Sequence, residues 1–90
     1  MLFEWDGIKR EKNLRLHGID FERAKEIWQG PVLEIPSSQT QHGETRYLGI
    51  GETEGRFLTV VFTWRENRRR IISARIARRD EREKYQKEIS

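Results

Sequence analysis

The apolar residues of this chain occur in short runs whose spacing predicts two helices near its start. Residues 2–5 form a short strand or an extended arm. Asp6 is placed to cap a helix over about residues 7–16, which Gly18 would end. A second helix is predicted after Asp20, because apolar residues follow it at helical spacing before a Gly-Pro pair ends the pattern: Phe21, Ala24, Ile27 and Trp28.

Strand signals dominate the middle of the chain and predict an antiparallel meander of about four strands. A polar loop is expected over residues 37–43, and the strands cover residues 32–35, 46–51, 57–64 and 71–76. In the last strand, regular alternation would turn every second side chain to the same face of the sheet. On that rule, Ile72, Ala74 and Ile76 face one way, and Ile71, Ser73 and Arg75 face the other.

A charged segment over residues 78–88 is predicted to be a final helix, supported by i,i+4 pairs of opposite charge. The order of elements is therefore strand, two helices, antiparallel meander and helix. This order defines a single α+β domain over residues 1–90, with helices packed on one sheet. Its predicted core consists of Phe3, Ile8, Phe21, Ala24, Ile27, Leu48, Ile50, Leu58, Val60, Phe62, Ile72, Ala74 and Ile76.

Composition excludes several classes of function. The chain has 90 residues, of which 34% are hydrophobic and 37% charged, so its core must be thin. It has no cysteine and two histidines, which excludes a disulfide scaffold, a thiol nucleophile and a thiolate zinc site; no metal or other cofactor is expected. No run approaches the roughly 20 apolar residues that span a bilayer, and the first residues lack the features of a signal peptide. We expect a cytoplasmic protein without a membrane partner.

The net charge of +3 is unevenly distributed along the chain. Residues 1–60 hold 8 Lys and Arg against 10 Asp and Glu, whereas residues 61–90 hold 10 against 5. Eight of those last ten basic residues are arginine, whose planar fork matches phosphate oxygens. The last third of the chain therefore indicates a site for phosphate or for an acidic partner, unless these residues only form a solvated helix face.

The clearest candidate chemistry is a group of arginines on consecutive predicted strands. Arg46, Arg65 and Arg75 lie on three neighbouring strands or at their ends, so an antiparallel meander can bring them to one face. A concave basic site of this kind binds RNA phosphates and stabilises the additional charge of a phosphoryl-transfer transition state. Further RNA contacts are expected from the first helix and from the start of the last one: Lys9, Lys12, Asn13, Arg78 and Arg79.

Metal-free RNA cleavage also requires a base for the 2′-hydroxyl and an acid for the leaving oxygen. The candidates are His17, Glu44 and Tyr47, and His17 is favoured because histidine is the side chain whose charge changes near neutral pH. Structural alternatives remain open. His17 can close the turn between two helices, Tyr47 can stack a base or lie half-buried in the sheet, and Arg75 can form a salt bridge. His42, in the polar loop, is expected to be solvated.

Several segments taken together resemble the BrnT family of toxins. Near the start, the resemblance lies in Phe3-Glu4-Trp5-Asp6, Lys9, Asn13 and His17-Gly18-Ile19-x-Phe21-x-x-Ala24. Further along, it lies in Gly43-Glu44-x-Arg46, Gly55-Arg56, Phe62-Thr63-x-Arg65, Arg70-Ile71-Ile72-Ser73-Ala74-Arg75 and Ala77-Arg78-Arg79-x-Glu81-Arg82-x-x-Tyr85. The match spans nearly the whole chain.

The resemblance implies a RelE/ParE-like fold and a toxin of a type II toxin–antitoxin system that blocks translation by cleaving RNA through 2′-hydroxyl attack. It also implies a neutralising antitoxin with a ribbon-helix-helix DNA-binding domain. Two toxins and two antitoxins would form a complex that represses its own operon. Operator DNA would then be bound only through the antitoxin.

Two positions depart from the family's pattern. Many members carry a lysine before the His-Gly pair, where this chain has Leu16, and a basic residue after the Ser-Ala-Arg triplet, where it has Ile76. The loss of two cations leads to an alternative: a non-catalytic toxin-fold protein that acts only through antitoxin binding and operon autoregulation. A third hypothesis is a gyrase-directed toxin, since some proteins of this fold class act on gyrase.

Overall fold

The computed structural model describes residues 1–38 and 43–89. In chain order the elements are β1 (Phe3–Trp5), α1 (Gly7–His17), α2 (Phe21–Ala24), the 3₁₀ helix η1 (Lys25–Gln29), β2 (Leu33–Pro36), β3 (Tyr47–Thr53), β4 (Arg56–Arg65), β5 (Arg68–Ile76) and α3 (Arg79–Ile89). The expectations for His42 and for the middle of the 37–43 loop concern residues outside these ranges. None of the described helices is both long and apolar enough to cross a membrane.

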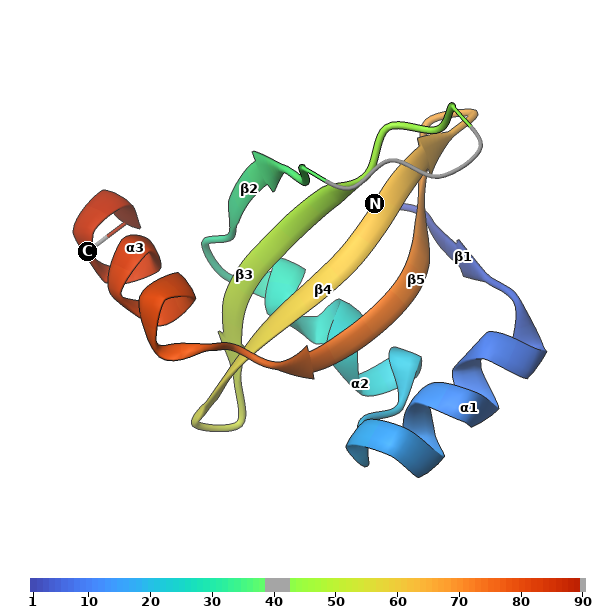
Figure 1. Cartoon of the computed structure of the whole chain (residues 1–90), viewed down its shortest axis with the longest axis horizontal. Coiled ribbons are helices and arrows are strands. Elements are labelled where there is room, and N and C mark those ends of the chain that lie inside the picture. The colour runs from blue at the N-terminus through green and yellow to red at the C-terminus, as the bar shows by residue number, and fades with distance from the viewer. Residues whose placement is uncertain (39–42, 90) are drawn as a thin grey trace.

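The strands form one sheet in the order β1-β5-β4-β3-β2, which confirms the α+β class (Figure 1). The four strands after the helices form the predicted antiparallel meander. The sheet has five strands where about four were expected, because the N-terminal arm is itself a strand. Its residues Phe3–Trp5 pair in parallel with Arg69–Ile71 of β5.

The two helix starts follow the capping signals in the sequence. The Asp6 carboxylate accepts a hydrogen bond from the Lys9 backbone N–H at 3.0 Å, and Gly18 ends α1 in the left-handed region with φ 70°. The Asp20 carboxylate likewise caps α2 by accepting from the Glu22 N–H at 3.1 Å. A short polar side chain at the N-cap satisfies a backbone donor that the helix leaves open.

Helix α2 covers one face of the sheet, α1 packs against the β5 edge, and α3 packs near β2 and β3 at the other edge (Figure 1). The main core lies between α2 and the sheet and consists of Ile19, Phe21, Ala24, Ile27, Leu58, Val60, Ile71 and Ala74. Burial of these side chains is the chief favourable contribution to folding. The other face of the sheet is therefore left for a site.

A β-bulge in β5 overturns the predicted facing of its side chains. Val61 pairs with Ser73 and Phe62 with Ile71, so Ile72 is an extra residue on β5. Because an extra residue shifts the alternation by one, Ile71 and Ala74 both enter the core. The prediction that Ile72 shares the core face with Ala74 was wrong, because Ile72 lines a hollow on the opposite face. Ile76 does lie on the face of Ala74, since it pairs with the core residue Leu58, but it is 51% exposed and not part of the core.

Glycine at position 49 allows close packing between β3 and η1. A Cβ atom there would lie 2.8 Å from Cζ2 of Trp28, whose indole N–H donates to Glu34 at 2.8 Å. We expect Gly49→Ala to lower the free energy of unfolding by about 1–3 kcal/mol, because the indole must move out of its contacts. Urea unfolding measures this change. Gly30→Ala is the control, since a Cβ at Gly30 meets nothing within 4 Å; equal stabilities of the two variants would contradict the prediction.

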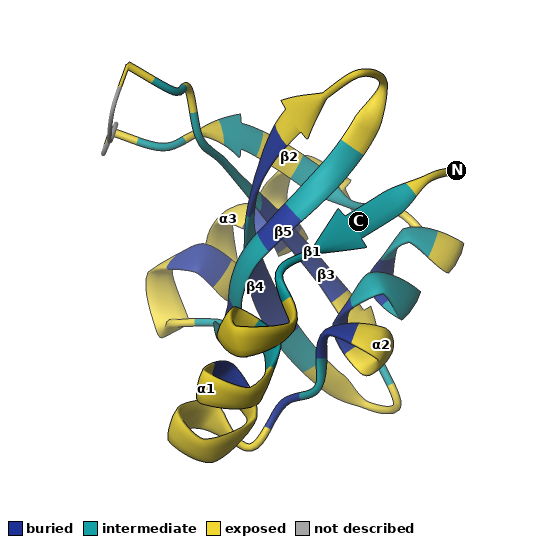
Figure 2. Cartoon of the chain, turned by 90° about the vertical axis from the view of Figure 1, so that its right-hand side faces the viewer, coloured by how far each residue is buried: buried dark blue, intermediate teal, exposed yellow. Residues whose placement is uncertain are grey.

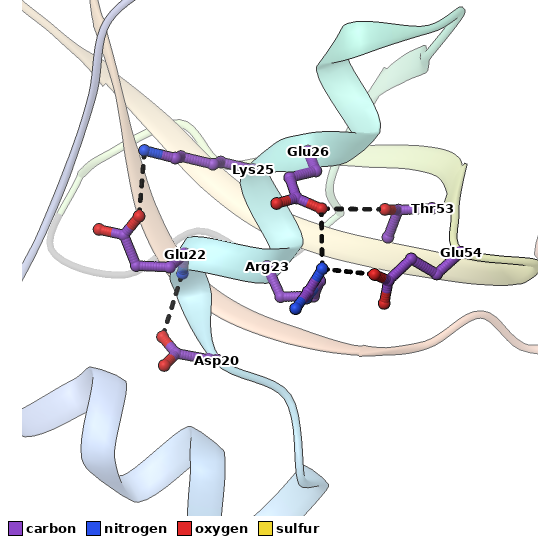
Figure 3. Close-up of polar contacts among 7 residues, drawn as sticks. All are labelled: Asp20, Glu22, Arg23, Lys25, Glu26, Thr53 and Glu54. Atoms are coloured by element: carbon purple, nitrogen blue, oxygen red, sulfur yellow. Dashed lines mark hydrogen bonds and ion pairs between the residues drawn. The ribbon is translucent and has the colours of Figure 1, made fainter.

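A polar network ties α2 and η1 to the turn between β3 and β4 (Figure 3). The Arg23 guanidinium donates to Glu54 and to Glu26, and the Thr53 hydroxyl also donates to Glu26. Lys25 and Glu22 form a further ion pair at 3.1 Å. Exposed pairs of this kind contribute little individually. We therefore expect the network to add little to the stability of the fold.

Helix α1 rests on the edge of the sheet through a polar contact. Its surface is largely exposed (Figure 2), and Asn13 is its buried residue, at 5% exposure. The Asn13 amide exchanges two hydrogen bonds with the backbone of Ala74, at 2.9 and 3.0 Å, and donates a third to the Ile19 carbonyl. Beyond the end of β1, the side chain thus takes the place of a neighbouring strand along β5.

Candidate functional site

The face of the sheet opposite the main core is hollowed between β3, β5 and the start of α3. The hollow has a volume of about 520 Å³, and its basic lining consists of His17, Arg46, Arg75 and Arg78. Its floor includes strand residues, among them Leu48, Val61, Ile72 and Ser73. Three guanidinium groups face one carboxylate, that of Glu81, so the hollow carries a positive charge suited to an anion.

Four elements of the chain place these basic side chains together. Arg46 directly precedes β3, Arg75 lies near the end of β5, Arg78 precedes α3 and His17 is the last residue of α1. Arg75 reaches the hollow because the bulge at Ile72 sets the facing of the residues after it. His17 reaches it because Asn13 fixes α1 against β5. The structure thus brings together four of the residues that the sequence singled out.

Arg75 forms the salt bridge that the sequence left as an alternative, and it lines the hollow at the same time. Its Nη1 and Nη2 donate to Oε1 and Oε2 of Glu81 at 2.7 and 2.8 Å. The Glu81 carboxylate also accepts from the Thr59 hydroxyl at 2.9 Å and from the Arg78 backbone N–H at 2.8 Å. Because Thr59 lies on β4, Arg75 on β5 and Glu81 on α3, these contacts to one carboxylate join the three elements.

The ionisation of this pair reflects its surroundings. Burial on its own would raise the pKa of Glu81, but hydrogen bonds from Arg75, the Arg78 N–H and Thr59, together with the charge of Arg75, outweigh it and lower the pKa to about 2. The hydrogen bond to Glu81 raises the pKa of Arg75 above its ordinary value. Both groups are therefore charged across the physiological pH range.

Acid should weaken the fold through Glu81. The folded-state pKa of about 2 lies below the ordinary value of 4.5, so the unfolded chain binds more protons between these values and stability falls as pH drops through them. We expect the free energy of unfolding, measured in urea, to decline less steeply from pH 4.5 toward pH 2 in Glu81→Gln than in wild type. Asp20, whose pKa is also lowered to about 2, contributes to both slopes. Parallel curves for the two proteins would contradict this assignment.

A second, smaller hollow adjoins the first along α1. It has a volume of about 250 Å³ and shares three lining residues with the larger one, which are His17, Ile72 and Ser73. Its remaining lining consists of Lys9, Lys12, Asn13 and Leu16. The two lysines extend the basic surface beyond the first hollow, whereas the Asn13 amide is engaged in the three backbone hydrogen bonds of the fold.

Other candidate residues lie outside the large hollow. Arg65 is at the far end of β4, where its Nη2 lies 3.7 Å from a carboxylate oxygen of Glu44. Tyr47 stacks on Phe62 with ring centroids 5.7 Å apart, and Phe62 is fully buried. Arg79 points along α3 and pairs with Glu83 at 3.1 Å. These side chains are not in the lining that holds Arg75.

Sequence reasoning missed Glu81 and Thr59 as parts of the site. A signal for Glu81 was present, because it stands three residues after Arg78, the residue that directly precedes the last helix, and this is the capping-box position for a glutamate. Thr59 carried no local signal, since its partner lies 22 positions along the chain. Among the described residues, no three His, Cys, Asp or Glu side chains are grouped as metal ligands.

The fold and the hollow define a class: a small α+β protein with a basic hollow on the face of its sheet opposite the main core. Comparison with protein families makes this more specific. The family model described as the ribonuclease toxin BrnT of type II toxin–antitoxin systems matches residues 5–81. The chain belongs to this family, whose members are ribonuclease toxins and are paired with an antitoxin. Comparison with curated proteins gave no match.

Proposed function

We propose that this protein is a metal-independent endoribonuclease that blocks translation and cleaves RNA in the hollow between β3, β5 and α3. The observation that carries the proposal is the convergence of Arg46, Arg75, Arg78 and His17 in one hollow of about 520 Å³. A phosphodiester with its flanking sugars fits a hollow of this size, and guanidinium groups match its oxygens. Membership of a ribonuclease family supports the same reaction.

In the proposed reaction, the 2′-oxygen attacks the neighbouring phosphorus and the bond to the 5′-oxygen breaks. His17 takes the proton from the 2′-hydroxyl, and the 5′-oxygen leaves with a proton from an acid at the site. The arginines hold the pentavalent phosphate, whose charge is greatest in the transition state. The products are a 2′,3′-cyclic phosphate and a 5′-hydroxyl, so no water enters the first step.

Basic residues outside the hollow are proposed to hold the RNA strand on either side of the cleaved bond. Lys9 and Lys12 line the adjoining hollow, and Arg79 follows Arg78 at the start of α3. At the far end of β4, Arg65, which lies beside Glu44, is proposed to contact the RNA strand where it continues along the sheet. Contacts of this kind to phosphates add affinity without sequence preference.

Incubation of purified protein with end-labelled RNA in excess chelator tests the reaction. We expect fragments that end in 2′,3′-cyclic phosphate, and we expect His17→Ala to lower their rate of formation about 10²- to 10⁴-fold. Lys84→Ala, an exposed change on α3 away from both hollows, is the control. Intact RNA after incubation with folded wild-type protein would refute the reaction. Fragments that end in a 3′-hydroxyl would refute attack by the 2′-oxygen.

We also propose that the partner antitoxin carries a ribbon-helix-helix domain and forms a complex of two toxins and two antitoxins that binds operator DNA through the antitoxin. The sequence resemblance supports the partner class, and the charge of the hollow supports an acidic or hydrogen-bonding segment as its contact. The association rate measured by stopped flow should fall as ionic strength rises. A rate independent of salt would exclude electrostatic steering.

A specific observation favours a second candidate, a non-catalytic toxin-fold protein that acts only through antitoxin binding. Leu16 is 75% exposed beside the smaller hollow and Ile76 is 51% exposed at the end of β5, where the resemblance leads one to expect cations. Stable antitoxin binding with no RNA turnover at high protein concentration would support this candidate. Restored cleavage in Leu16→Lys would show that the missing cation is the cause.

A further inference from the structure

The carboxylate of Glu81 is held from three sides before any substrate binds. It accepts four hydrogen bonds: two from Arg75, one from the Thr59 hydroxyl and one from the Arg78 backbone N–H. Its side chain is 10% exposed, and that of Arg75 is 21% exposed. Because Thr59 and the Arg78 N–H fix the carboxylate from β4 and from the helix start, the carboxylate is in turn able to fix the guanidinium.

The contact leaves one edge of the Arg75 guanidinium for another ligand. A guanidinium has five N–H donors, and those on Nε and the adjacent Nη form a second fork that matches two phosphate oxygens. Within the described residues, Arg75 gives one donor from Nη1 and one from Nη2 to Glu81. Glu81 thus occupies the end of the group and not its Nε edge.

We propose that Glu81 is a positioning residue, which holds Arg75 by its Nη atoms so that the Nε edge is presented to the phosphate that is cleaved. The proposal rests on the proposed ribonuclease function. An arginine held in advance loses less side-chain freedom when the phosphate binds, and it stabilises the transition state without reorganising. Glu81 itself touches neither the RNA nor the reacting atoms.

Glu81→Gln is the main test, because glutamine keeps the size of the side chain and an acceptor for the Arg78 N–H. We expect kcat for RNA cleavage to fall about 10- to 100-fold with KM nearly unchanged, since a misplaced group affects the transition state more than binding. Glu83→Gln is the matched control on α3, since it also breaks an arginine–glutamate pair but at an exposed position. Its kcat should equal that of wild type.

A second variant separates positioning from stability. Thr59→Val removes one hydrogen bond to the carboxylate without touching Arg75, and we expect a smaller loss of kcat than in Glu81→Gln. Thermal unfolding of each variant gives the folded fraction at the assay temperature. Losses of kcat that only follow the folded fraction, or a Glu81→Gln enzyme with wild-type kcat, would overturn the proposal.

A direct readout of the guanidinium does not depend on cleavage. The ¹⁵N signal of the Arg75 Nε–H, identified by its absence in Arg75→Lys, should be sharp in wild type and shift when an oligonucleotide with a 2′-deoxy cleavage site is added. In Glu81→Gln it should be broadened. If wild type cleaves no RNA but shows this pattern, the positioning role stands and the ribonuclease proposal fails. An unchanged signal in Glu81→Gln refutes the positioning role.

Discussion

Replacing Arg75 with alanine should lower the rate of RNA cleavage about 100- to 1000-fold, which is the usual loss when one preorganised donor to a transition state is removed. Arg75 lines the hollow and is fixed by Glu81 through both Nη atoms. Arg75→Lys keeps the charge but not the planar fork, so its rate should also be reduced. Single-turnover cleavage of labelled RNA measures both rates.

The Arg75→Ala result must be separated from a loss of fold, because the change leaves Glu81 in a largely buried position without its charged partner. Urea unfolding gives the stability of the variant, and the cleavage rate is compared at a temperature at which it is folded. The control is Arg56→Ala, which removes an exposed arginine at the start of β4, away from the hollow. If the two variants cleave RNA equally fast, Arg75 has no part in the reaction.

Asn13→Ala should lower the free energy of unfolding by about 3 kcal/mol, the second large effect we expect. The change removes three hydrogen bonds at a position 5% exposed and leaves polar backbone groups of Ala74 and Ile19 buried without their partner. The affinity for RNA, measured at a temperature at which the variant is folded, should remain that of wild type. Urea unfolding and fluorescence anisotropy measure the two quantities.

Lys12→Ala is the matched comparison for Asn13→Ala, because Lys12 is the exposed neighbour that lines the smaller hollow. It should show the opposite result, with unchanged stability and weaker RNA binding. Loss of RNA affinity in Asn13→Ala without loss of stability would return Asn13 to the set of RNA contacts. Asn13 was assigned to that set from its place on the first helix alone.

Local signals in the sequence were sufficient for the elements of the fold. Capping by Asp6 and Asp20 and the two hairpin turns are encoded within a few residues, so their boundaries were predicted closely. The parallel pairing of β1 with β5 was not predicted, because it joins residues 66 positions apart, as in Phe3 with Arg69. Three residues are too few to carry a pattern that identifies such a partner.

The first helix shows where a hydrophobic pattern fails. Ile8 was expected in the core and is 75% exposed, while the polar Asn13 is buried. The reason is that α1 meets an edge of β5 where backbone N–H and C=O groups require a partner, and an amide supplies both a donor and an acceptor. The hydrophobic pattern of a sequence indicates where apolar groups are buried. It does not indicate where backbone groups need a hydrogen-bond partner.

For the site, sequence reasoning brought arginines on neighbouring strands to one face, and the structure places Arg46 and Arg75 in one hollow. Arg65 was expected beside them, but it lies at the far end of β4 near Glu44. Strand register determines how far along the sheet each residue lies. Register is set by the loops and the bulge, so it cannot be predicted from the residue types along each strand.

The bulge in β5 also makes the length of that strand as constrained as its composition. Before Ile72 and after it, the strand alternates in opposite phases, much as a reading frame changes at an inserted base. Deleting Ile72 would restore a regular ladder with Ala74 still facing the core and Arg75 still facing the hollow, whereas one residue inserted after Ser73 would turn Ala74 out of the core and Arg75 toward it. Substitutions in the hollow are therefore independent of the core, whereas a single residue inserted in β5 after the bulge exchanges the two faces.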